Sequence, residues 1–184
     1  MKVEEIMLLF PDFLEITDEN LRFKAIQATA LAMESGGWTF ETAEQAPVTL
    51  NWPDCRCNLI EHVRTVTRVC LSTYEQLAPF YKDNGVPFDR DTVACGALLH
   101  DIGKWTEFCL KDGKPVHSET SDLLRHPLSG AILADRAGLP VKIVHLIATH
   151  SFEGERSYKT AESDFVRSID EFVFHCTVYG LQKK

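Results

Sequence analysis

The feature that most constrains this chain is a run of small apolar residues that ends in two polar side chains. Residues 94–104 read ACGALLHDIGK. The run predicts a buried helix that presents the imidazole of His100 and the carboxylate of Asp101 side by side at its end, where Gly103 allows the helix to stop. A buried carboxylate is unfavourable unless it is paired or binds a metal ion. We therefore expect both side chains to face one cation, although so short a motif also occurs as a surface dipeptide.

Size and charge limit the class of protein. The chain has 184 residues, of which 45% are hydrophobic and 25% charged, as in a single globular domain with a sizeable core. Its formal net charge of -8 argues against a nucleic-acid duplex or an anionic membrane as the main partner. No segment approaches the roughly 20 apolar residues of a membrane span. The first residues are acidic and lack the apolar stretch of a secretory signal.

The six cysteines follow no framework spacing. We therefore expect reduced thiols in a cytoplasmic protein rather than a disulfide scaffold. Cys55 and Cys57 form a close pair that could bind a metal or act in redox chemistry, but no second pair completes a zinc site.

Apolar periodicity and capping residues predict an all-α fold, a compact helical bundle with one short β-hairpin. The hairpin is expected in residues 108–116, with Asp112 and Gly113 at its turn. Residues 1–52 are expected to be a helical extension packed on the domain formed by residues 53–184. Helices are expected at residues 17–35 (capped by Thr17 or Asp18), 53–82 (opened by Pro53 and Asp54), 89–103, 126–137, 140–150 and 163–179 (capped by Ser163).

Helical phase adds four polar side chains to the pair that ends the apolar run. His62 and His150 lie on apolar stripes of their helices, and His126 opens a helix in which Gly130 leaves room for close approach. Asp170 lies among apolar residues, whereas Asp164 falls about 120° away around the helix, where water can solvate it. The structural alternatives are core histidines for the imidazoles and a buried salt bridge for Asp170.

Together these residues form one potential ligand set. Imidazole and carboxylate are ligands of the divalent ions of Fe, Mn, Zn, Co and Ni. Six inward-facing ligands exceed what one tetrahedral ion requires, and two neighbouring ions that share a carboxylate would use them all. The predicted ligands are His62, His100, Asp101, His126, His150 and Asp170.

This ordered pattern resembles the HD-domain superfamily of metal-dependent phosphohydrolases over residues 55–180. The family's His, His-Asp and late Asp match His62, the pair His100 and Asp101, and Asp170. His126 and His150 resemble the additional histidines of two-metal members, including the cyclic-dinucleotide phosphodiesterase branch. The residues after His150 read SFEGE and depart from that branch, which argues against its substrate.

The resemblance implies a phosphohydrolase that acts on a nucleotide or another small phosphate ester through attack of metal-bound hydroxide. It implies one or two divalent transition-metal ions, with Asp101 as the shared ligand. Lys104 would contact the phosphate, or else be a solvated lysine at a helix end. Off-phase positions predict structural roles for His145 and His175. We expect a structural role for His117 as well.

Two other functions remain open at this point. Inositol oxygenases and phosphonate-cleaving oxygenases resemble the same superfamily and hold two irons in a similar ligand set, so a di-iron oxygenase is the main alternative. A catalytically silent binding module would need the metal only for its fold. The sequence is compatible with a homodimer.

Overall fold

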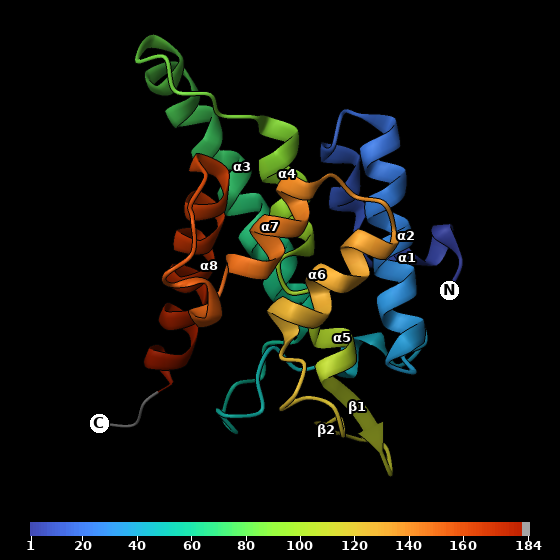
Figure 1. Ribbon diagram of the computed structural model, residues 1–184. Coiled ribbons are helices and arrows are strands. Elements are labelled where there is room, and N and C mark those ends of the chain that lie inside the picture. The colour runs from blue at the N-terminus through green and yellow to red at the C-terminus, as the bar shows by residue number, and fades with distance from the viewer. Residues whose placement is uncertain (182–184) are drawn as a thin grey trace.

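The computed structural model describes residues 1–181, and its architecture is helical (Figure 1). The all-α prediction with a single short hairpin is confirmed. The α-helices are α1 (Val3–Leu9), α2 (Glu19–Ser35), α3 (Leu59–Asp83), α4 (Arg90–Leu99), α5 (Lys104–Glu107), α6 (His126–Arg136), α7 (Val141–Thr149) and α8 (Ala161–Gly180). Short 3-10 turns occur at η1 (Pro11–Glu15), η2 (Ala43–Gln45) and η3 (Phe152–Gly154).

Reciprocal hydrogen bonds set where the two longest helices begin. The Asn58 side chain accepts from Glu61 N at 2.8 Å and the Glu61 side chain accepts from Asn58 N at 3.1 Å, so α3 begins at Leu59. The prediction that Pro53 and Asp54 open this helix is wrong, because these two residues lie in a turn before it.

The last helix also begins earlier than its predicted cap. Thr160 and Ser163 exchange backbone-to-side-chain hydrogen bonds of 2.9 and 3.1 Å, which makes Thr160 the cap and places Ser163 inside α8. The prediction of Ser163 as the cap is therefore wrong. Asp18 caps α2 as predicted, since its side chain accepts from Leu21 N at 2.9 Å.

The hairpin pairs β1 (Phe108–Lys111) with β2 (Lys114–His117) in antiparallel register. At its tip Asp112 and Gly113 both have positive φ angles, of 53° and 72°. Two successive positive φ angles match the twist of an antiparallel pair, and Asp-Gly tolerates them well. The hairpin base therefore places Phe108 and His117 next to each other, with ring centroids 5.3 Å apart.

The helices surround a core that extends from the N-terminal segment to the centre of the bundle. In Figure 1, α4 and α7 lie in the middle, between α8 on one side and α2 on the other. Helix α2 contacts α4, α5 and α6, so the N-terminal segment shares one apolar core with the rest of the domain. A second, smaller cluster lies where α3 and α4 contact α8.

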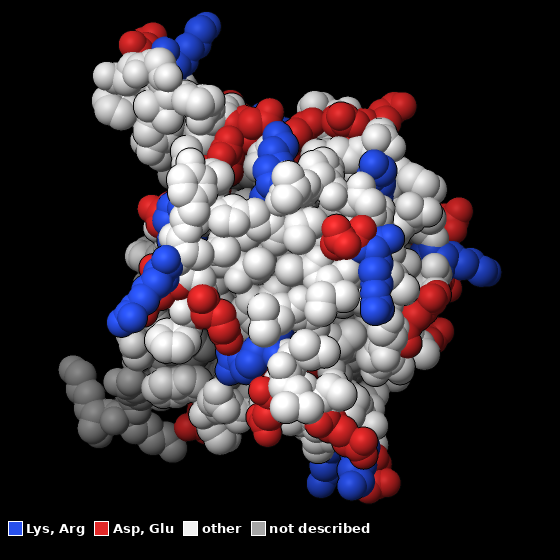
Figure 2. All heavy atoms as spheres, in the orientation of Figure 1, with Lys and Arg blue, Asp and Glu red and all other residues white. Residues whose placement is uncertain are grey.

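Surface charge is mixed on the face shown in Figure 2. Uncharged residues cover its centre, over α6 and α7, and acidic and basic side chains alternate around the edge. Within residues 1–181, no helix combines the length and the apolar character that crossing a bilayer requires.

Candidate metal centre

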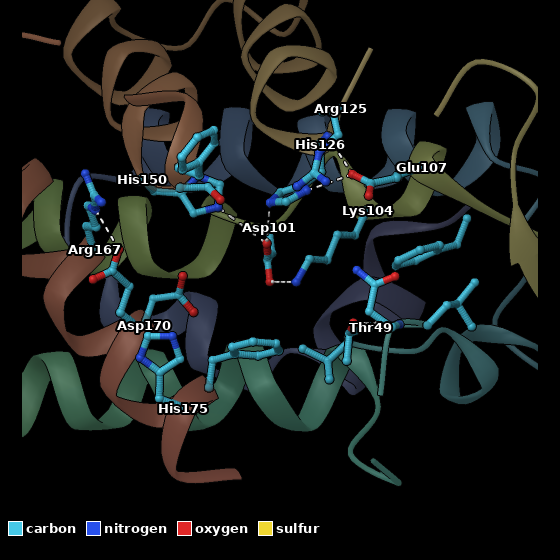
Figure 3. Close-up of a pocket in the computed structure, with 18 of the residues that line it drawn as sticks. Thr49, Asp101, Lys104, Glu107, Arg125, His126, His150, Arg167, Asp170 and His175 are labelled. Carbon is cyan, nitrogen blue, oxygen red and sulfur yellow. Dashed lines mark hydrogen bonds and ion pairs between the residues drawn. The ribbon is translucent and has the colours of Figure 1, made fainter. Parts of the chain in front are cut away.

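The structure brings all six predicted ligand residues together in the middle of the bundle, and Figure 3 labels four of them, Asp101, His126, His150 and Asp170. They come from the ends or inner faces of separate helices, and five of the six are buried. His100 and His150 end α4 and α7, while His126 begins α6. The six fall into two groups of three whose potential ligand atoms lie within 4.8 Å of one another: His62, His100 and Asp170 form group one, and Asp101, His126 and His150 form group two.

Group one combines two imidazoles with the carboxylate of α8. His62 Nε2 lies 2.9 Å from Asp170 Oδ1 and 3.4 Å from His100 Nε2. His100 Nε2 lies 3.5 Å from the same Asp170 oxygen. Asp164, the alternative aspartate of α8, is exposed in the first helical turn and does not belong to either group.

Asp101 lies between the two groups. Its Oδ1 is 3.4 Å from His126 Nε2 and 3.5 Å from His150 Nε2, within group two. Its Oδ2 is 3.4 Å from the Nε2 atoms of both His62 and His100, in group one. One carboxylate thus presents a different oxygen to each set of imidazoles.

Hydrogen bonds on the far side of two rings fix which nitrogen faces the centre. His100 Nδ1 donates to Ala97 O and His150 Nδ1 donates to Ile147 O, each at 2.7 Å. A carbonyl oxygen only accepts, so the proton is on Nδ1 in both rings. Each Nε2 therefore carries a lone pair when the ring is neutral, as metal coordination requires.

The buried charges shift the pKa values of the group-one side chains and of Asp101. Burial lowers the pKa of His62 despite the opposing effect of Asp170. Burial also acts to lower the pKa of His100, but Asp101 and Asp170 outweigh it and raise that pKa to about 10. Burial acts to raise the pKa values of the carboxyl groups of Asp101 and Asp170. For Asp101, the charges of Lys104 and His100 outweigh burial and lower the pKa well below its ordinary value. For Asp170, the charge of His100 outweighs burial and lowers the pKa in the same way. The site holds two carboxylates whose charge needs a nearby cation.

These residues fit a divalent transition-metal ion. His150 Nε2 is buried and has no hydrogen-bond partner within residues 1–181, which is costly for a polar atom unless it has a ligand. Imidazole nitrogens and carboxylate oxygens are the donors that such ions prefer. Cys55 and Cys57 belong to neither group, and burial raises the pKa of Cys57 to about 11, which disfavours the thiolate.

A cavity of about 320 Å³ opens over the cluster. Lys104, the first residue of α5, lines it and places Nζ 2.7 Å from Asp101 Oδ2. His117 and His175, for which the sequence predicts structural roles, also line this cavity. His145 packs near Tyr158, with ring centroids 6.2 Å apart.

Sequence reasoning missed several other side chains of the cavity. Glu107, Arg125 and Arg167 line it, as does the loop that contains Thr49. Glu107, Arg125 and the loop lie outside any apolar stripe, so no periodic signal marks them. Arg167 lies three residues before Asp170 on the same face of α8, and that spacing could have identified it.

Two glycines allow the turn after Asp101 to approach α6. A Cβ atom on Gly103 would meet the backbone of His126 and would lie 2.7 Å from Gly130 N. A Cβ atom on Gly130 would lie 2.9 Å from the Ile147 side chain and 3.1 Å from Gly103 N. Only residues without side chains let the two segments pack this closely, and that packing puts His126 beside Asp101.

An all-α bundle with a buried cluster of histidines and aspartates defines a helical metal-binding domain. The sequence profile of the HD domain matches residues 59–173, more than half of the chain. The chain therefore belongs to the HD-domain family, as the order of its histidines and aspartates predicts.

The chain is also similar to a curated protein, the dihydroneopterin 2′,3′-cyclic phosphate phosphodiesterase of Methanocaldococcus jannaschii. The two are 33% identical over 141 residues, which cover 74% of this chain and 55% of the relative. The chain thus spans about half the length of that relative. No solved structure matches the chain. Neither similarity supports the di-iron oxygenase alternative.

Proposed function

We propose that this chain is a metal-dependent phosphohydrolase that cleaves a small phosphate ester. The observation that carries the proposal is the position of Asp101, whose two oxygens lie within 3.5 Å of imidazole nitrogens from two separate groups. A carboxylate shared by two neighbouring ions suits displacement at phosphorus. The HD-domain match and the phosphodiesterase relative support the same class of reaction.

Some side chains of the site would bind the ions and others would bind the substrate. Bound divalent ions would polarise the phosphoryl group and lower the pKa of a water molecule. Group one and group two would hold the ions, and Lys104 Nζ would donate to a phosphate oxygen at the cavity wall. Because Lys104 also pairs with Asp101, its ammonium is already oriented before substrate arrives.

A second cation is available for an anionic substrate. The Arg167 side chain is 14% exposed, and its Nε donates to Glu171 Oε1 at 2.8 Å. Its two terminal nitrogens make no hydrogen bond or ion pair within residues 1–181, and the residue lines the cavity. A guanidinium held in this way can bind a phosphate with both terminal nitrogens.

The substrate we propose is a small phosphodiester. A cavity of about 320 Å³ is at the lower end of the range for small-molecule sites. The relative is named for its action on dihydroneopterin 2′,3′-cyclic phosphate, a cyclic phosphodiester. Cyclic phosphodiesters of nucleosides and of pterins are therefore the first compounds to test, beside simple monoesters.

The test begins with protein stripped of metal by a chelator and reloaded with Mn, Fe, Co, Ni or Zn. Each form is assayed against cyclic phosphodiesters, an open diester and monoesters, with metal content measured in parallel. We expect at least one loaded form to hydrolyse a diester. Asp101→Asn should lower bound metal and cut turnover by about 100-fold or more, because the ions that would stabilise charge in the transition state are lost. Asp122→Asn, an exposed change of the same type, should match the unmodified protein. Loaded protein that leaves every ester intact but consumes oxygen would instead favour the oxygenase.

A further inference from the structure

Glu107 is a buried carboxylate that directly contacts the proposed metal centre from outside its ligand set. It ends α5, is 5% exposed, and lines the cavity. Its Oε2 accepts two hydrogen bonds from one residue: His126 N lies 2.6 Å away and His126 Nδ1 lies 2.7 Å away (Figure 3). A single oxygen therefore holds both the backbone and the ring of His126.

The position of His126 in its helix explains why such a partner is needed. His100 and His150 lie at helix ends, and each uses the carbonyl three residues earlier in its own helix to hold Nδ1. His126 is the first residue of α6 and has no preceding helical turn to supply a carbonyl. Its backbone N–H is also one of the donors that a helix leaves without an internal acceptor. Glu107, 19 residues earlier in the chain, satisfies both groups.

The contact with Glu107 determines which ring nitrogen of His126 faces the proposed metal centre. A carboxylate only accepts hydrogen bonds, so the His126 proton that faces Glu107 is on Nδ1. That leaves Nε2 as the atom that faces Asp101 Oδ1, at 3.4 Å. A carboxylate behind a ligating imidazole fixes its tautomer and orientation and increases its basicity.

We propose that Glu107 is a positioning residue for group two and that it selects the Nδ1–H tautomer of His126. The consequence for metal binding rests on the proposed function, because it needs an ion in group two. The consequence for the tautomer does not, because it concerns the protein before any ion binds.

The experiment compares Glu107→Ala and Glu107→Gln with Glu153→Gln. Glu153 follows His150 by three residues and pairs with Arg125 rather than with a histidine, at 3.1 Å, so its variant removes a nearby negative charge without touching an imidazole. The first measurement is ¹⁵N NMR of the metal-free proteins, with the His126 signals assigned by their loss in His126→Asn. The second is the dissociation constant of each ion from equilibrium titration with Co²⁺ or Mn²⁺, while circular dichroism checks the helical fold.

We expect the unmodified protein and Glu153→Gln to show protonated Nδ1 and bare Nε2 at His126, and Glu107→Ala to lose that preference. Affinity for the ion in group two should fall by about 10- to 100-fold in Glu107→Ala, with a smaller loss in Glu107→Gln, whose amide oxygen still accepts but carries no charge. Affinity for the ion in group one should not change.

A proton on Nε2 of His126 in the unmodified protein, or an unchanged tautomer in Glu107→Ala, would overturn the positioning role. A protein that binds no second ion and hydrolyses no ester would refute the proposed function, and the tautomer would still decide the role of Glu107.

Discussion

Asp101 is a buried carboxylate that lies close to an unusually large number of polar side chains. It is 2% exposed and lies within 3.5 Å of four imidazole nitrogens. A lone carboxylate at this depth would be strongly unfavourable. The charges of Lys104 and His100 hold the pKa of Asp101 well below its ordinary value. Bound divalent ions would add positive charge beside this carboxylate.

The two aspartates of α8 give a matched test of the last ligand. Asp170 lies 2.9 Å from His62 Nε2, whereas Asp164 is exposed near the helix start. Asp170→Asn keeps the shape but removes the charge, so metal affinity in a titration should fall at least tenfold, with loss of turnover. Asp164→Asn should cost only a few tenths of a kcal/mol of helix stability. The opposite ranking in the titration would exclude Asp170 as a ligand.

At the residue scale, the sequence predicts the position of a site side chain where the helical phase fixes the direction in which that side chain points. The phases of His62, His150 and Asp170 within their helices are enough to place them on inner faces, and the structure does bring them together. That they bind metal stays a prediction. Glu107 could not be found in this way, because its partner His126 is 19 residues away and depends on how α5 meets α6.

At the scale of elements, close backbone contact rather than side-chain chemistry joins the turn after α4 to α6. Gly103→Ala would drive a methyl group into the backbone of His126 and Gly130. Overpacking of this kind costs about 1–3 kcal/mol, and here it also separates Asp101 from His126. We expect a lower midpoint in thermal unfolding and a weaker affinity for the ion in group two in titration.

Gly180→Ala is the control for this change. A Cβ atom on Gly180 meets nothing within 4 Å, and alanine favours helix over glycine. Its unfolding midpoint should be equal or higher. Equal midpoints for Gly103→Ala and the unmodified protein would show that α6 moves away freely.

Helix ends were the least predictable part of each element. The true caps of α3 and α8 are Asn58 and Thr160, while the sequence also offers Pro53, Asp54 and Ser163 as plausible starts. Which one is used depends on the reciprocal hydrogen bond with the third helical residue. Short elements such as α1 and α5 escaped prediction because one or two turns give too little periodicity.

At the scale of the whole molecule, Asp91 ties the N-terminal segment to the bundle. It accepts hydrogen bonds from Thr17 N, Thr17 Oγ1 and Asp18 N at 2.7 to 2.9 Å, which joins the starts of α2 and α4. Burial alone would raise the pKa of Asp91, but these hydrogen bonds outweigh it and hold the pKa below its ordinary value. The folded state therefore favours the ionised carboxylate more than the unfolded state does.

The stability that Asp91 contributes should depend on pH. Because the folded pKa is the lower one, the contribution is complete above about pH 4 and is lost as the pH falls through the folded value. We expect Asp91→Asn to reduce the free energy of unfolding by about 1–2 kcal/mol at pH 7, and the difference to shrink below pH 4. Denaturant unfolding from pH 3 to 7 measures it, with exposed Asp54→Asn as the control. A difference that is constant with pH would mean that the charge plays no part.

The fold class could be predicted from the sequence because long amphipathic helices leave few other arrangements. The path of residues 36–58 could not be predicted. That segment has no period, and it adopts turns whose positions depend on contacts with α3 and the cavity. The division into an extension, residues 1–52, packed on the domain of residues 53–184 within one structural unit stays a prediction. The two parts share one apolar core.

The buried tryptophan next to Lys104 has an optical consequence. Trp105 packs edge-on against Trp38 with ring centroids 5.8 Å apart, and Trp38 Nε1 donates to Trp105 O at 2.8 Å. Both indoles are at most 3% exposed, so their fluorescence should be blue-shifted relative to that of half-buried Trp52. Any rearrangement of the turn that carries Asp101 and Lys104 must move the carbonyl bonded to Trp38. The protein therefore contains a built-in fluorophore for this turn, and we expect any ion or ligand that moves the turn to change the emission without an added label.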